Sequence, residues 1–223
     1  NGSVAIGQDA LNAQVFGTST TSFNVGVGFS AGVSVTSGQS NTLMGYEAGK
    51  FVTTGAANTF VGSAAGLGIT GAKLTGSNNT CIGQSAGEKL QAAGADNVFV
   101  GALAGDASTR GALNVAVGRS SLTADQFGQR TTAVGYFALG AMVSPDPGGT
   151  DTNNMKQTAV GYAAGGSLQT GHTNTLIGYQ AGDALTTGTS NVCLGVDADT
   201  GANNSANAIC IGTSITAATN RIV

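Results

Sequence analysis

Several residue types that enzymes and nucleic-acid-binding proteins rely on are scarce or absent in this chain of 223 residues. It contains no tryptophan, one histidine and two prolines, and charged residues make up 9% of it. A formal net charge of −3 gives no electrostatic reason to expect nucleic acid or an anionic membrane surface as a partner. No apolar run approaches the roughly 18 residues of a membrane-spanning helix, so the sequence predicts no membrane insertion.

Glycine, in contrast, is abundant, with 37 copies. It does not recur at every third position and proline is scarce, which excludes a collagen helix. Instead, one glycine closes a short motif that recurs along the whole chain, most clearly at Asn41–Gly49 and Asn174–Gly182. Seven of the eleven spacings between these central glycines are 17 residues, and the others are 21, 21, 18 and 26. The central glycines are Gly7, Gly28, Gly45, Gly62, Gly83, Gly101, Gly118, Gly135, Gly161, Gly178, Gly195 and Gly212. A fixed period over twelve copies predicts a repeat architecture.

The residues before each central glycine indicate a short strand. The residue directly before the glycine is aliphatic or Met, and the residue two positions earlier is Val, Ile or Thr. Residues two apart share one face of a strand, and the residue between them, which is also apolar or Gly, points to the other. The pattern therefore predicts a strand that is covered on both faces, as parallel strands usually are.

A second glycine lies seven residues before the central one in most copies, for example Gly55, Gly76 and Gly188. Pairs such as Thr53-Thr54 often precede it, which indicates a second short strand that ends in a tight turn. One repeat then forms two strands and two turns, and it must stack on its neighbours to bury its apolar face. We expect an all-β, parallel β-solenoid with about twelve rungs, one for each repeat, in a single array over residues 1–223.

Asparagine occupies the position four residues before the central glycine in eight copies: Asn24, Asn41, Asn58, Asn79, Asn97, Asn114, Asn174 and Asn191. In stacked rungs these side chains would form a ladder in which each amide bonds to the next. Alternatively, each Asn caps its own turn, and both roles can hold at once.

Taken together, Ser3-Val4-Ala5-Ile6-Gly7 and the later Asn-Thr-x-Ile/Val-Gly-x-x-Ala-Gly units resemble the YadA-type head repeats of trimeric autotransporter adhesins. They are still more similar to repeats of bacteriophage tail fibres, in which segments like Tyr179–Gly182 and Leu185–Asn191 alternate. The resemblance implies a left-handed parallel β-roll and a homotrimer, either side by side or intertwined, located outside the cell on a virion. It also implies other fibre or baseplate segments and a host cell-surface receptor as partners, with a glycan as one candidate receptor. Because Asn220–Val223 starts a thirteenth copy, we expect the chain to be a segment of a longer fibre.

The longest spacing, between Gly135 and Gly161, contains both prolines within an insertion at about residues 140–156. Insertions in solenoids form loops on one face, which is often the binding face. The hypothesis is a receptor-contact loop, and a tolerated change of length is the alternative. The candidate contact residues are Ser144, Asp146, Thr150, Asp151, Asn153, Asn154 and Lys156.

The sequence offers no catalytic, cofactor-binding or metal-binding set. The single histidine, His172, falls in a turn, and the carboxylates are scattered. Cys81, Cys193 and Cys210 occupy the middle position of their strands, which predicts free, buried thiols. We therefore expect a structural or adhesive protein with no enzymatic activity and no cofactor.

Tyrosines that follow central glycines predict an aromatic ladder or, alternatively, a sugar-stacking platform. The head of a bacterial surface adhesin is the main alternative identity. An enzyme that cleaves surface polysaccharide and an ice-binding face of Thr ranks are further alternatives.

Overall fold

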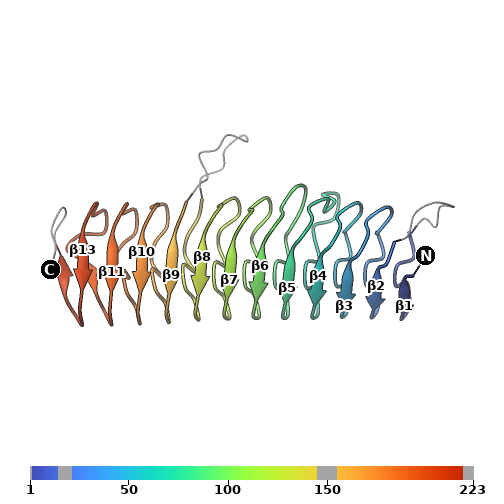
Figure 1. Cartoon of the computed structure of the whole chain (residues 1–223), viewed down its shortest axis with the longest axis horizontal. Helices are drawn as coiled ribbons and strands as arrows, with labels where there is room; N and C mark the ends of the chain where they lie inside the picture. The colour runs from blue at the N-terminus through green and yellow to red at the C-terminus, as the bar shows by residue number, and fades with distance from the viewer. Residues whose placement is uncertain (1, 15–21, 145–154, 218–223) are drawn as a thin grey trace. The chain divides into compact units, whose positions relative to one another are not determined.

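A computed structural model describes residues 2–14, 22–144 and 155–217. The chain forms two compact units, Asn1–Ala112 and Leu113–Val223. In the described residues both units are all-β, without helix, and each is a parallel β-solenoid of six rungs (Figure 1). The expected all-β solenoid of about twelve rungs is thus confirmed. The single array over residues 1–223 stays a prediction, and Asn220–Val223 lie outside the described residues.

Every rung contributes one three-residue strand that ends directly before a central glycine. In the first unit the strands are β1 (Val4–Ile6), β2 (Val25–Val27), β3 (Thr42–Met44), β4 (Thr59–Val61), β5 (Thr80–Ile82) and β6 (Val98–Val100). In the second unit they are β7 (Val115–Val117), β8 (Thr132–Val134), β9 (Thr158–Val160), β10 (Thr175–Ile177), β11 (Val192–Leu194) and β13 (Ile209–Ile211). Within each unit neighbouring strands pair in parallel and in register, as Leu43 with Phe60 and Leu176 with Cys193. The register follows the repeat across rungs of different length, because the extra residues lie in the connections.

The central glycines are required by both backbone conformation and space. Gly62 has a φ of +135°, a backbone conformation that residues other than glycine rarely adopt. A Cβ on Gly62 would lie 2.5 Å from the carbonyl oxygen of Gly83 on the next rung. Each central glycine therefore allows the next rung to approach at strand spacing.

The second strand predicted for each rung is mostly absent. The described residues hold one such pair, β12 (Asp199–Thr200) with β14 (Thr216–Ala217), and elsewhere isolated bridges such as Val52 to Leu74. Scattered backbone hydrogen bonds still link these segments, as from the Thr36 N–H to the Thr53 carbonyl. The prediction of two strands per rung was therefore wrong, because this side has too few consecutive ladder bonds.

Two positions of each rung face the interior, and in several rungs they compensate for each other in size. The middle strand residue points inward, and the second position lies six residues later. Phe60 pairs with Gly66 and Phe99 with Gly105, and a Cβ on Gly105 would lie 2.7 Å from the Phe99 ring. In two rungs the strand residue is small and the second position is large, since Ala116 pairs with Leu122 and Ala133 with Leu139. All four of these side chains are buried. The rungs of Gly26 and Ala159 instead have Gly32 and Gly165 at the second position, and leucines of neighbouring rungs, such as Leu11 and Leu139, occupy the space beside these glycines. Close packing is thus achieved between rungs as well as within one.

The regularly spaced asparagines form a buried ladder of hydrogen bonds between rungs. The side-chain amide nitrogen of Asn58 donates to Oδ1 of Asn41 at 3.1 Å and to the carbonyl of Gly76 at 3.1 Å. Oδ1 of Asn58 in turn accepts from the backbone N–H and the side chain of Asn79. These bonds all run to neighbouring rungs, so the ladder prediction is confirmed. Gln157 takes the same position in the second unit, where its Oε1 accepts from the backbone of Asn174.

Candidate interaction surface

The outward face of the strands carries exposed apolar side chains. The first and third residues of each strand point away from the interior, whereas the middle residue is buried in all strands of three residues except β1. Met44, Ile82 and Ile177 are each about two-fifths exposed, at 41%, 39% and 41%. Within one chain only the inner strand face is covered, and cover of the outer face by further copies stays a prediction. Its inner face forms the core, and its outer face remains in solvent.

An aromatic ladder runs beside this outward face in the second unit. Tyr136, Tyr162 and Tyr179 each follow a central glycine on consecutive rungs. Their ring centroids are 5.2 Å and 5.1 Å apart, with interplanar angles of 15° and 9°. The first unit has a shorter version, in which Phe29 stacks on Tyr46 at 5.4 Å. The predicted ladder is confirmed, because equivalent side chains on neighbouring rungs are placed about one strand spacing apart.

The stacking decides which part of each ring is available. The ring of Tyr162 is covered on one face by Tyr136 and on the other by Tyr179, so it cannot stack on a sugar. The guanidinium of Arg119 lies 6.0 Å from the centroid of the Tyr136 ring. What remains exposed is the edge of the ladder, with about half of each tyrosine accessible. Such an edge, continuous with an apolar strand face, suits another protein surface better than a glycan.

The insertion is described only at its two ends. Asp146, Thr150, Asp151, Asn153 and Asn154 lie outside the described residues. Lys156 is exposed, in keeping with a contact role.

At the other end, Ser144 is 1% exposed, which leaves its side chain no surface for a receptor contact. Its backbone N–H donates to Oδ1 of Asp125 at 3.1 Å. Ser144 therefore anchors the base of the insertion within the core.

Asp125 is a buried carboxylate that sequence reasoning missed. The same Oδ1 also accepts from the backbone N–H of Gly128 at 3.1 Å. Burial raises the pKa of Asp125, and the hydrogen bonds from Ser144, Gly128 and Phe127 oppose that rise only in part. Asp125 stands at a variable position of the repeat, so the repeat pattern gave no signal of this role.

No other cluster in the described residues suggests chemistry. All three cysteines are free and buried, as predicted, and burial raises the pKa of the Cys81 thiol. His172 is exposed in its turn, and its Nδ1 lies 2.9 Å from the Thr173 hydroxyl. Among the described residues no three His, Cys, Asp or Glu side chains gather as metal ligands would. The described part of the chain also contains no helix that could cross a membrane.

Comparison of the chain with protein-family models, with curated proteins and with solved structures finds no match.

Proposed function

We propose that this chain is an adhesive segment of a bacteriophage tail fibre, in which three copies pack through their outward strand faces. The observation that carries the proposal is the exposed apolar face with its aromatic edge, on a solenoid whose interior is already filled. Water-exposed apolar side chains in regular ranks are costly unless another surface covers them. A left-handed β-roll and a homotrimer, as the resemblance to fibre repeats implies, would provide that cover.

In this proposal the segment works mechanically rather than chemically. The asparagine ladder and the packed core would keep the rungs rigid, and the insertion, whose residues 145–154 lie outside the described ones, is proposed as a side loop. Three loops, one from each copy, would form a collar that contacts a receptor on the host cell surface. The proposed location is therefore the outside of a virion, with other fibre or baseplate segments as further partners.

The head of a bacterial surface adhesin is the second candidate, because its repeats resemble this chain over the same motif. The neighbouring parts of the gene distinguish the two. A self-cleaving chaperone after the array supports the phage fibre, and a coiled-coil stalk with a membrane anchor supports the adhesin.

Adsorption to cells tests the adhesive role. The labelled protein is incubated with a panel of bacterial strains and with animal extracellular matrix, and bound label is measured. The matched variant lacks residues 146–154, which restores the 17-residue spacing between Gly135 and Gly161. We expect the intact protein to bind a subset of bacterial strains and the deletion variant to lose most of that binding. Equal binding by both would remove the insertion from the receptor site, and binding to matrix alone would support the adhesin.

A further inference from the structure

Two cationic side chains occupy equivalent positions on neighbouring rungs of the second unit. Arg130 and Lys156 each lie two residues before a strand, and the first residues of those strands, Thr132 and Thr158, pair in register. Both residues have a left-handed backbone conformation, with φ of 58° for Arg130 and 47° for Lys156, so the two side chains start from the same local geometry. Both are exposed. The two positive charges therefore lie on the same edge, about one strand spacing apart.

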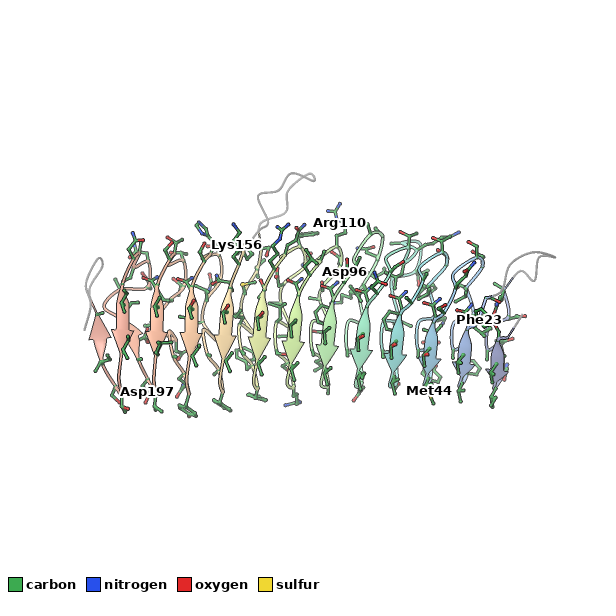
Figure 2. All side chains as sticks on the ribbon, in the orientation of Figure 1. Phe23, Met44, Asp96, Arg110, Lys156 and Asp197 are labelled. Atoms are coloured by element: carbon green, nitrogen blue, oxygen red, sulfur yellow. The ribbon has the colours of Figure 1, made fainter. Side chains whose placement is uncertain are left out.

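No acidic side chain neutralises this pair among the described residues. Neither Arg130 nor Lys156 forms an ion pair there, and Asp125 of the same unit is buried. Asp197 lies two residues after the central Gly195, beyond the other end of its strand, and Figure 2 shows Lys156 and Asp197 at opposite edges of their rungs. The next rung adds the exposed imidazole of His172 to the edge that carries the cations.

Like charges at equivalent positions of neighbouring rungs repel each other. Placing Arg130 beside Lys156 therefore lowers the stability of the fold unless an anion lies between or beside the two charges. In a chain with a net charge of −3 and only eight Lys and Arg residues, two adjacent cations without an acidic partner among the described residues are a distinct feature. Asp146 and Asp151 of the insertion lie outside the described residues. Nucleic acid is the poorer fit, because a chain with a net charge of −3 and eight Lys and Arg residues offers no extended basic surface.

We propose that Arg130 and Lys156 bind the carboxylate or sulfate groups of an acidic polysaccharide. This inference rests on the proposed function, since it specifies the receptor class for the edge from which the insertion extends. Three copies of the pair would act together on one polymer chain, so weak individual contacts would add up through avidity. Two cations in each of three chains give about six ion pairs, and about two-fold in affinity for each exposed pair predicts an effect of about 60-fold.

Binding is measured with polygalacturonate, dextran sulfate and uncharged dextran on a biosensor at low and at physiological salt. The test variant is R130Q/K156Q. The matched control is K73Q/K89Q, which removes two exposed cations of the first unit and changes the net charge equally. We expect the wild type and the control to bind one or both acidic polymers but not dextran. The test variant should bind about 60-fold more weakly.

Three outcomes overturn the inference. The first is that the wild type binds neither acidic polymer. This outcome overturns the inference even if D146N/D151N gains binding, because Asp146 and Asp151 of the chain itself would then neutralise the two cations. Another is equal binding by the test variant and the wild type. The third is stronger binding of single-stranded DNA than of the acidic polysaccharides. The native mass of the same samples separates the two proposals. A trimer that ignores polyanions refutes this inference alone, whereas a monomer refutes the proposed function.

Discussion

The size compensation inside the rungs predicts a specific double-mutant rescue at Phe60 and Gly66. Phe60→Ala alone removes the largest fully buried side chain of its rung and should cost about 3–5 kcal/mol of unfolding free energy. Gly66→Leu alone should also be strongly destabilising, because the three atoms nearest to an added Cβ all belong to the Phe60 ring. The combination F60A/G66L recreates the pairing of Ala116 with Leu122, which the chain already uses.

The rescue is supported by backbone geometry. Gly66 has a φ of +54°, and Leu122 occupies the equivalent position with a φ of 52°. A leucine is therefore tolerated in this left-handed conformation, at a cost of about 1–2 kcal/mol. We expect the double variant to be more stable than the sum of the single effects by at least about 2 kcal/mol.

Urea-induced unfolding, followed by far-ultraviolet circular dichroism, gives the four free energies of this cycle. Phe60→Leu, which reproduces the natural pairing of Leu43 with Gly49, is the control and should cost about 1 kcal/mol. Strictly additive effects would refute the reasoning, because they would mean that the two positions do not share one space.

Further predictions concern buried polar groups. Asn58→Ala should lower the free energy of unfolding by about 3–5 kcal/mol, because it leaves several buried partners unpaired. In the same urea titration, the control Asn78→Ala at an exposed position should lower it by well under half as much. Because burial raises the pKa of Asp125 above its unfolded value, the stabilising contribution is present in acid and is lost as pH rises through the folded pKa. Wild-type stability should therefore increase on acidification through that range, whereas Asp125→Asn should flatten this part of the pH profile and be more stable at pH 7; a steeper profile would contradict the assignment. A thiol reagent should label none of the three cysteines in the native protein and all of them in denaturant, and full labelling of the native protein would show that they are not buried.

Much of the fold follows from the sequence because the repeat is so regular. The strand position, the register across rungs of unequal length and the asparagine ladder could all be predicted from the spacing of Gly and Asn. The stacked tyrosines followed from the same argument, as Tyr162 and Tyr179 are 17 residues apart. A period tells which residues are equivalent, and stacking then places equivalents next to each other.

Other features depend on what the period does not encode. The apolar outward face was predicted to be covered, yet a single chain cannot cover it, because apolar character does not specify whether the partner is the same chain. Gln157 continues the ladder in place of Asn because its amide reaches the same partners, as its Nε2 donates to the Gly171 carbonyl. The hydrogen bond that the Ser144 backbone N–H donates to Asp125 forms where the insertion breaks the repeat, so no equivalent position could indicate it.

The most direct test of the central claim, that the outward strand face is a self-interface, is the native mass in solution by light scattering. We expect a value near three times 21.6 kDa for the wild type. Ile177→Lys, in the centre of the face, should shift the mass toward that of one chain, while Gln169→Lys, on an exposed turn, should not. A wild-type protein with the mass of a single chain, at all concentrations up to those used for adsorption, would contradict the claim.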